Sequence, residues 1–260
     1  RRGLATVLNN MGVVNLTRGD VGLAIERFEE ALRIRREIGD RARIGNALSN
    51  YAEARALAGD VDAADAAYRE AVDLLRDAGE ASGVKSALTG RARFLRRRGE
   101  FGPAEETLAE AVAMEGRDPA VRAAFHLEAA EQHAVRGEPE AVGRAAEQGL
   151  ELSGEIGDLL GRAQACRLLA GARGGADRED ASRLLEEAEE LLSGTSGPEL
   201  ARVLLERGIL HLDHDPRAAR EALMRARGLL DAMEARGAVL PERESVERLL
   251  SAEVPEPGAD

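Results

Sequence analysis

Few side chains in this sequence have the types and spacing that metal binding would require. His211 and His214 lie three residues apart, and Asp213 and Asp215 stand beside them. Imidazole and carboxylate groups together can bind a divalent metal ion. No further ligand is identifiable, however, and Asp and His are common in the turns that separate helices. We therefore interpret this stretch as a turn and predict no cofactor.

Residues that could support catalysis are also sparse. His126 and His133 lie seven residues apart and would share a helix face, but such pairs are more often packed or solvent-exposed than catalytic. Cys166 is the only cysteine, which excludes an internal disulfide, and we interpret it as a small buried apolar residue. Neither a phosphate-binding loop before Lys85 nor a serine nucleophile elbow occurs. We predict that the chain is not an enzyme, and a hidden hydrolase or transferase site is the weakest alternative.

The composition narrows the classes of partner. The 260 residues carry a net charge of −12, whereas nucleic-acid binding needs clustered positive charge, so we expect no direct contact with nucleic acid. No apolar run approaches the roughly 20 residues that span a bilayer, and we expect no membrane contact. A single cysteine suits a reducing cytoplasm, which is the predicted compartment. Since the chain begins with Arg1 and not with methionine, we expect it to be part of a longer protein.

Glycine followed by an acidic residue recurs along the chain and divides it into segments. Glycine adopts the left-handed conformation that ends a helix, and an acidic residue favours the positive start of the next helix. Two interleaved series of breaks, each spaced by about 40 residues, leave segments of about 20 residues. The first series is Arg18-Gly19-Asp20, Ala58-Gly59-Asp60, Arg98-Gly99-Glu100, Arg136-Gly137-Glu138, Ala176-Asp177 and His214-Asp215. The second is Gly39-Asp40, Gly79-Glu80, Arg117-Asp118-Pro119, Gly157-Asp158, Ser196-Gly197-Pro198 and Gly237.

The segments between the breaks have helical periodicity. Apolar residues recur at spacings of three and four, as in Ala24, Phe28 and Ala31. No stretch alternates apolar and polar residues between turns, as a strand would. Aromatic residues make up only 2% of the chain, and the small apolar residues that dominate suit closely spaced helices. We predict an all-α fold.

Aligned on their breaks, the segments resemble the tetratricopeptide repeat. Small residues stand where the helices of such a repeat touch, and large apolar residues stand between them. The matching positions are Leu8, Met11, Gly12, Ala24, Phe28 and Ala31 in the first unit, Leu48, Tyr51, Ala52, Ala64, Tyr68 and Ala71 in the second, and Leu88, Arg91, Ala92, Ala104, Leu108 and Ala111 in the third. The units are about 40 residues long, as in kinesin light chains, cell-polarity adaptors and large bacterial regulators.

The resemblance implies a right-handed α-solenoid of six helix pairs with a C-terminal capping helix. The repeats would span residues 3–39, 41–79, 81–117, 119–156, 158–195 and 198–236, and the capping helix would span 241–252. Residues 1–252 would form one superhelical domain. Residues 253–260 have no apolar face and would be a disordered tail.

Stacked helix pairs form a superhelix with a concave face, and the resemblance implies that this face binds a protein or peptide. High alanine and arginine content favours the repeat region of a larger bacterial regulator. The main alternative is a structural module through which the parent protein forms a homo-oligomer. The register of the family would place on the concave face Asn9, Asn10, Val13, Asn50, Glu53, Arg93, Arg97 and Glu131.

Two of these candidates are asparagines at the same position of successive repeats. The side-chain amides of Asn10 and Asn50 can both donate to and accept from the backbone of an extended peptide. A local hydrogen bond or simple hydration of these amides is an equally good interpretation.

Arginines dominate the third unit of the predicted concave face. Arg93 and Arg97 form a dense basic run with Arg96 and Arg98, and guanidinium groups can bind a carboxylate or phosphate through two hydrogen bonds. An acidic peptide would suit this run. The interpretation that we favour is a solvated face whose charge complements the negative end of the helix dipole.

Overall fold

A computed structural model describes residues 1–112, 118–194, 197–240 and 242–252 of the chain. The predicted tail at 253–260, residues 117 and 196 at predicted breaks, and residue 241 at the start of the predicted capping helix lie outside the described residues. Within the described ranges the regular elements are all helices, as predicted. They are α1 (Arg2–Thr17), α2 (Val21–Ile38), α3 (Arg41–Leu57), α4 (Val61–Asp77), α5 (Ala81–Arg97), α6 (Phe101–Val112), α7 (Pro119–Val135), α8 (Pro139–Ile156), α9 (Leu159–Arg173), α10 (Arg178–Leu191), α11 (Pro198–His211), α12 (Pro216–Glu234) and α13 (Glu242–Ala252).

The glycines at the predicted breaks end the helices through their backbone conformation. Gly39 after α2 has φ = 78° and Gly157 after α8 has φ = 70°, in the left-handed region that a residue with a Cβ atom rarely adopts. The next helix then starts at an aspartate in several places. The carboxylate of Asp40 accepts a hydrogen bond from the backbone N–H of Arg43, and Asp158 does the same for Gly161. The prediction of these helix ends is confirmed.

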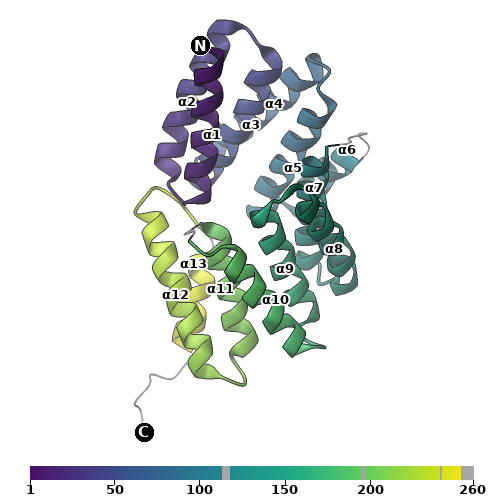
Figure 1. The fold of residues 1–260 in the computed structure, drawn as a ribbon, viewed down its shortest axis with the longest axis vertical. Coiled ribbons are helices and arrows are strands. Elements are labelled where there is room, and N and C mark those ends of the chain that lie inside the picture. The colour runs from purple at the N-terminus through teal and green to yellow at the C-terminus, as the bar shows by residue number, and fades with distance from the viewer. Residues whose placement is uncertain (113–117, 195–196, 241, 253–260) are drawn as a thin grey trace.

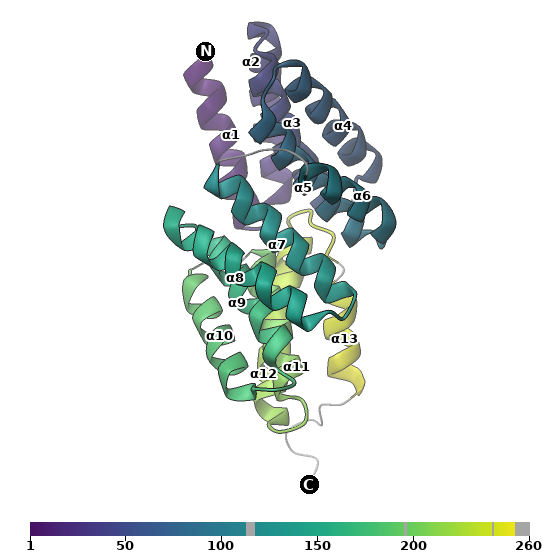
Figure 2. The ribbon, with the colours of Figure 1, turned by 90° about the vertical axis from the view of Figure 1, so that its right-hand side faces the viewer.

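Consecutive helices pack as antiparallel neighbours, and the pairs stack in sequence order (Figure 1). Each odd-numbered helix from α1 to α11 is here called a first helix, and the even-numbered helix that follows it is called a second helix. Figure 2 shows α1 to α4 at one end of the molecule, α10 to α13 at the other end and α7 between them. The stacking of pairs explains why no pair has to bury its apolar face alone.

Small residues permit the close approach of the two helices of a pair. A Cβ atom on Gly12 in α1 would lie 2.5 Å from the ring of Phe28 in α2. The same holds for Gly208 in α11, whose Cβ atom would lie 2.7 Å from Leu223 in α12. Both glycines occupy the small-residue position that the repeat pattern predicts.

The superhelix brings its C-terminal end into contact with its N-terminal end. The N–H of Val239 donates to the carbonyl of Leu57 at 2.6 Å, and the N–H of Gly22 donates to the carbonyl of Arg236 at 3.3 Å. Arg236 also pairs with Asp20 at 2.9 Å, across 216 residues of sequence. The segment after α12 therefore crosses to the lower ends of α1 and α2 (Figure 1).

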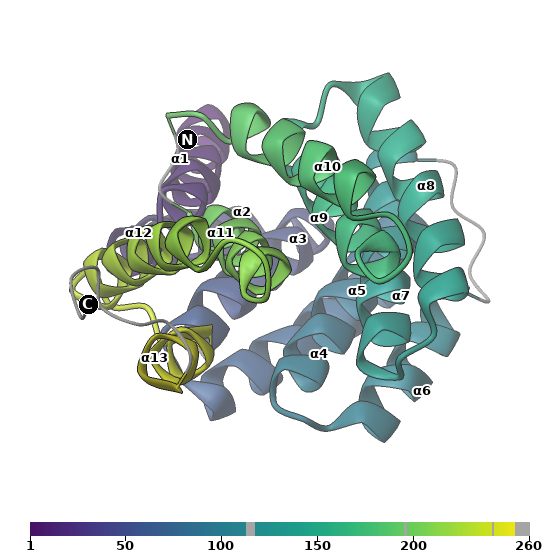
Figure 3. The same cartoon turned by 90° about the horizontal axis from the view of Figure 1, so that it is seen from below.

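The curvature separates an inner side from an outer side. In the view from below (Figure 3), the first helices α3, α9 and α11 lie near the centre, and the second helices α8, α10 and α12 lie toward the periphery. Helix α13 packs against α12 and α11. The inner side of the first helices is the concave face.

Candidate binding surface on the concave face

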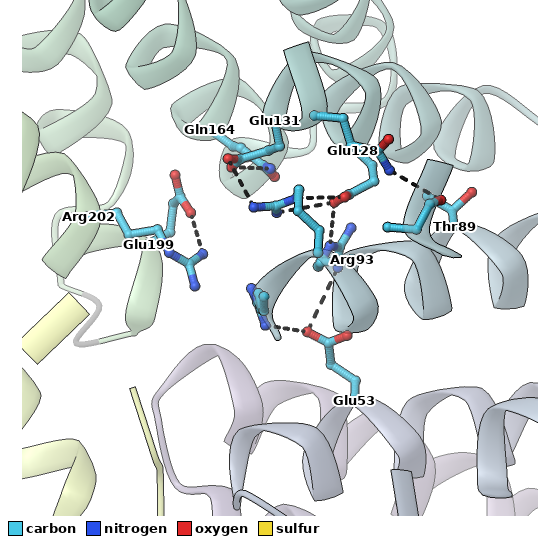
Figure 4. Close-up of polar contacts among 12 residues, drawn as sticks. Glu53, Thr89, Arg93, Glu128, Glu131, Gln164, Glu199 and Arg202 are labelled. Atoms are coloured by element: carbon cyan, nitrogen blue, oxygen red, sulfur yellow. Dashed lines mark hydrogen bonds and ion pairs between the residues drawn. The ribbon is translucent and has the colours of Figure 1, made fainter. Parts of the chain in front are cut away.

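Charged side chains from successive first helices meet in the interior of the superhelix, and their sign alternates along the chain (Figure 4). Acidic residues lie on α3 and α7, and arginines lie on α5 and α9. Arg93 and Arg167 each face carboxylates from both neighbouring first helices, whereas Arg96 faces α7 and Arg97 faces α3. We call this set the ionic network. It consists of Glu53, Arg93, Arg96, Arg97, Glu128, Glu131, Arg167, Glu199, Arg202 and Glu242.

Glu53 on α3 is the N-terminal member of the network. It accepts a hydrogen bond from the hydroxyl of Tyr68 at 2.9 Å and one from Arg97 at 3.3 Å, and Arg93 lies 3.8 Å away. Burial alone would raise the pKa of this carboxyl, but the positive charges of Arg93 and Arg97 outweigh it, so the pKa of Glu53 lies below its ordinary value. Glu53 is therefore ionised and held by three neighbouring side chains.

Glu128 on α7 is fully buried and faces two arginines of α5. Arg96 donates to its Oε1 atom at 2.8 Å, and Arg93 lies 3.5 Å from its Oε2 atom. A buried carboxylate without such partners would be strongly unfavourable. The positive charges of Arg93 and Arg96 thus compensate the negative charge of the buried Glu128.

Arg167 on α9 is the most enclosed cation of the network. Only 6% of the residue is exposed, and its Nε atom donates to Glu199 at 2.6 Å while an Nη atom donates to Glu131. Burial would lower the pKa of Arg167, but the charges of Glu131 and Glu199 outweigh it and raise the pKa. The network continues through Arg202, which pairs with Glu199 at 3.1 Å and with Glu242 of α13 at 2.6 Å.

Glu206 on α11 lies beside the network but outside it. Among the described residues, no ion-pair or hydrogen-bond partner contacts its half-buried carboxyl. Burial raises the pKa of Glu206, and the positive charge of Arg167 offsets this only in part. The charge of Glu206 is therefore less compensated than the charges of Glu53, Glu128 and Glu131, which all face arginines.

The N-terminal part of the concave face is neutral and polar. Asn50 on α3 donates its amide N–H to the amide oxygen of Asn9 on α1 at 3.3 Å. Asn9 and the exposed Asn46 also line a hollow of about 410 Å³ between the middle of α1, the end of α2 and the starts of α3 and α5. We call Asn9, Asn10, Val13, Asn46 and Asn50 the amide surface. Its members carry no charge, and its four asparagines keep hydrogen-bonding capacity toward solvent.

The eight residues predicted to form the binding face fall into two groups. Asn9 and Asn50 share a hydrogen bond, while Asn10 and Val13 are exposed on α1. The charged four, by contrast, belong to the ionic network: Glu53 faces both arginines, and Glu131 pairs with Arg96 and Arg167. The role of these residues in contacting a partner stays a prediction.

The interpretation of the basic run as a solvated face is wrong for three of its arginines. Only 25% of the side chain of Arg93, 13% of Arg96 and 22% of Arg97 are exposed, because each faces carboxylates of α3 or α7. Arg98 alone is largely exposed, and it pairs with Glu100. The alternating charge of neighbouring first helices is the physical reason for the difference.

Sequence reasoning missed the C-terminal half of the network. Arg167, Glu199, Arg202 and Glu242 were not among the candidates, although Arg167 follows Glu128 by 39 residues and so stands at the same repeat position. The sequence did contain one signal of the network: the same repeat position carries a glutamate in one unit and an arginine in the next. The contact between α11 and α13 had no comparable signal in the sequence.

The structure offers no alternative site for metal chemistry among the residues that it describes. No group of three or more His, Cys, Asp or Glu side chains in these ranges is arranged to hold a metal ion. Cys166 is buried, as predicted, and burial raises the pKa of its thiol to about 11. The described helices include none that is both long and apolar enough to cross a membrane.

Comparison with known proteins supports the resemblance at two levels. Residues 3–77 match the family model of the tetratricopeptide repeat, which confirms the predicted resemblance. A search of curated proteins found no match. Solved structures with the same kind of fold cover nearly the whole chain at low sequence identity, and at this identity they show the fold alone.

Three of these structures illustrate the likeness. The Rap conjugation gene regulator of plasmid pLS20, in complex with the Phr* peptide, has a TM-score of 0.73 at 16% identity and covers 93% of this chain and 66% of its own. A Rap protein complexed with competence and sporulation factor has a TM-score of 0.68 at 15% identity, over 93% of this chain and 71% of its own. The APC/C hetero-tetramer Cut9-Hcn1 has a TM-score of 0.65 at 16% identity, over 95% of this chain. The chain spans only 42% of that matched chain.

Proposed function

Because residues 3–77 match the tetratricopeptide repeat and the described helices continue the same stacking to α13, we propose that this chain is a scaffold that binds a protein or peptide segment on its concave face. The amide surface would make the main contacts. We further propose that the chain is the repeat region of a larger bacterial regulatory protein. The likeness to a conjugation gene regulator and to the quorum sensor NprR from B. thuringiensis, which has a TM-score of 0.60, supports this context.

The observation that carries the proposal is the pairing of Asn9 with Asn50. The hydrogen bond between them uses one N–H of Asn50 and the carbonyl oxygen of Asn9. The amide oxygen of Asn50 and the amide N–H groups of Asn9 remain available, in orientations that the mutual bond restricts. An extended peptide presents alternating N–H and C=O groups, which such a pair can accept from and donate to. Restricting the two amides before binding lowers the entropy cost of the complex.

The hollow beside these amides gives the ligand a place on the surface. Its volume of about 410 Å³ is lined by the amides of Asn9 and Asn46, by Ala42, and by the charged residues Arg35, Asp40, Arg43 and Glu80. The exposed Val13 provides an apolar contact one turn further along α1. This surface suits an extended segment with polar or small side chains.

The ionic network would contribute to binding mainly at its border with the amide surface. Arg93 and Arg97 already face Glu53, so an acidic ligand would compete with an internal carboxylate for both guanidinium groups. Glu131 is enclosed by Arg96 and Arg167 and is less accessible still. We therefore expect Glu53, Arg93, Arg97 and Glu131 to modulate affinity, and the asparagines to determine it.

A phage-displayed library of random linear heptapeptides, panned on residues 1–260, tests the proposal directly. Fluorescently labelled copies of the enriched peptides are then titrated against the chain and against the double variant Asn9→Ala/Asn50→Ala. We expect the variant to bind at least about tenfold more weakly, because about 1.4 kcal/mol is lost with the peptide hydrogen bonds. Circular dichroism and the Tm should not change, since both amides are only partly buried.

The matched control is Gln148→Ala, which removes an exposed amide from α8 on the outer side. It should leave peptide affinity unchanged. Equal affinity for wild type and Asn9→Ala/Asn50→Ala would contradict the proposed surface. Failure of the library to yield any enriched peptide would contradict peptide binding altogether.

A further inference from the structure

Helix α1 exposes a continuous apolar stripe on the side that faces away from the concave surface. Leu4, Val7, Met11 and Val14 are exposed to 52%, 55%, 45% and 46%, respectively. Their spacings of three, four and three residues place them on one face of the helix. Isolated exposed apolar residues need no explanation, but an aligned stripe of four on one helix marks an interaction site.

The equivalent positions in the second and third repeats are covered by another helix. The residues that follow Leu4, Val7 and Val14 by 40 positions are Ile44, Ala47 and Ala54 on α3, and these are exposed to only 7%, 0% and 0%. The residues that follow by 80 positions are Val84, Ala87 and Phe94 on α5, and they are exposed to 1%, 0% and 4%. These three repeat positions are therefore buried in the second and third pairs and exposed in the first, whereas the position of Met11 is occupied there by the half-buried Tyr51 and Arg91.

The cover over α3 and α5 is the second helix of the preceding pair. Helix α2 packs against α3, and α4 packs against α5. The apolar cluster that contains Ala54 also contains Phe28 of α2, and Leu32 of α2 lies in the cluster of Ile44 and Ala47. The stripe on α1 continues this established interface by one step, and it lacks only the covering helix.

The opposite end of the stack has no such opening. Helix α13 packs on α12, and Val246 of α13 joins the core with Leu230 and Met233 of α12. The outward residues Glu244, Arg248 and Ser251 of α13 are polar and exposed. Among the described residues, α13 therefore presents a polar outer face, whereas α1 presents an apolar one.

Charge distinguishes the possible occupants of the stripe. Residues 1–18 contain three arginines (Arg1, Arg2 and Arg18) and no acidic residue. Two copies of α1 packed against each other would bring only positive ends together, which is unfavourable. Helix α4, which covers α5, carries five acidic residues and two arginines. An acidic second helix has the complementary charge.

We propose that the stripe of α1 is a docking site for a net-acidic amphipathic helix of a partner protein. This helix packs on α1 as α2 packs on α3 and as α4 packs on α5. The site is separate from the pair of Asn9 and Asn50, because Asn9 and the stripe lie on different faces of α1; Asn10 borders the stripe, three residues from Val7 and four from Val14. The chain thus presents two interaction surfaces, one for an extended segment and one for a helix.

The probe for this site is a labelled peptide of residues 60–79, which contains α4, crosslinked on its polar face to keep it helical because an isolated helix of this length is marginally stable. Its binding to residues 1–260 is measured by fluorescence anisotropy, and hydrogen exchange locates the protected amides. We expect saturable binding with protection on α1, and at least about tenfold weaker binding to Val7→Asp/Val14→Asp. Both substituted residues are exposed, so the variant should fold with an unchanged Tm.

A matched control replaces two equally exposed apolar residues elsewhere. Val135→Asp/Leu159→Asp changes residues that are 48% and 52% exposed on α7 and α9, and it should bind the peptide as wild type does. The variant Asn9→Ala/Asn50→Ala should also bind normally, which separates this site from the proposed peptide-binding surface. Three results would overturn the proposal: protection of α5 in place of α1, equal loss in both aspartate variants, or a dimer in sedimentation equilibrium that Val7→Asp/Val14→Asp dissociates. The last result would identify a second copy of the chain as the occupant.

Discussion

The ionic network and the amide surface lie on the same concave face, yet they satisfy their polar groups in opposite ways. In the network, Arg167 and its carboxylate partners are bound to one another and largely withdrawn from solvent. On the amide surface, Asn9 and Asn50 share one hydrogen bond and keep further donors and acceptors open. The difference indicates that one region stabilises the superhelix while the other remains free to bind.

The alternation of sign along the first helices gives the network a structural role. From α3 to α9, each first helix presents the charge opposite to that of the next first helix, and Glu199 on α11 continues the alternation. Omitting a single pair would place like charges opposite each other in the interior, which is costly at low dielectric. We infer that the network helps to fix the order and curvature of the stacked pairs, whereas the apolar contacts between helices supply most of the stability.

The largest expected loss of stability comes from removing Arg167, the most enclosed cation of the ionic network. Arg167→Ala removes a close cation from both Glu131 and Glu199 and leaves these enclosed carboxylates with only Arg96 and Arg202, respectively. The free energy of unfolding should fall by about 3–5 kcal/mol, the usual cost of breaking a buried ion pair by removing one partner. Urea unfolding monitored by circular dichroism measures the change.

The neighbouring Arg162 on the same helix provides the comparison for Arg167→Ala. Arg162 pairs with Glu187 at 3.1 Å, and 34% and 46% of the two side chains are exposed. Arg162→Ala should therefore cost no more than about 1 kcal/mol. If both variants lost the same small amount, the network would have no special part in the stability of the fold.

The helix ends were predictable because they depend on local backbone chemistry. A glycine with positive φ and an aspartate that caps the next helix act within a few residues, so Gly39 and Asp40 mark a break without any tertiary information. The alignment on these breaks then placed the small residue Gly12 against Phe28. Fold class and repeat register follow from such local signals.

The partners of the concave residues depended on information that a repeat pattern does not contain. Arg97 reaches Glu53 across 44 residues, and this contact requires the curvature that accumulates over neighbouring pairs. The contact of Val239 with Leu57 requires the accumulated rotation of the whole stack. Residue type predicted that Arg97 could bind a carboxylate, but only the assembled superhelix shows that Glu53 supplies one.

Acid should weaken the network and leave the amide surface unchanged. Burial raises the pKa of Glu53 and Glu242, but facing arginines outweigh it and lower the pKa of both. A carboxyl whose pKa is lower in the folded state stabilises the fold above its unfolded pKa of about 4.3, and this stability is lost as the pH falls through the folded value. We therefore expect the Tm to decrease steadily as the pH falls below about 5.

The variant Glu53→Gln sharpens this pH experiment. It removes one of the titrating carboxylates, so its Tm should be lower than that of wild type at pH 7 and should depend less on pH between about 5 and 2. Parallel pH profiles for the two proteins would show that Glu53 does not contribute to acid sensitivity. Asn9→Ala/Asn50→Ala should keep the wild-type profile, because neither amide titrates.

The smallest change in Tm is expected for a substitution of Glu206, and this change should be an increase. Burial raises the pKa of Glu206, and Arg167 offsets this only in part, so its ionised form opposes folding. A carboxyl with a raised folded pKa favours the fold below its unfolded pKa of about 4.3, and it loses that contribution as the pH rises through the folded value. Glu206→Gln keeps the shape of the side chain and removes the charge, so it should raise the Tm at pH 7 slightly.

The pH dependence of this gain separates charge from packing. The advantage of Glu206→Gln should shrink as the pH falls toward 4, because wild-type Glu206 then becomes protonated and resembles the amide. Scanning calorimetry at matched ionic strength measures both profiles. A lower Tm of Glu206→Gln at pH 7 would mean that the ionised carboxyl stabilises the fold through Arg167, and Glu206 would then belong to the ionic network as a further acidic member.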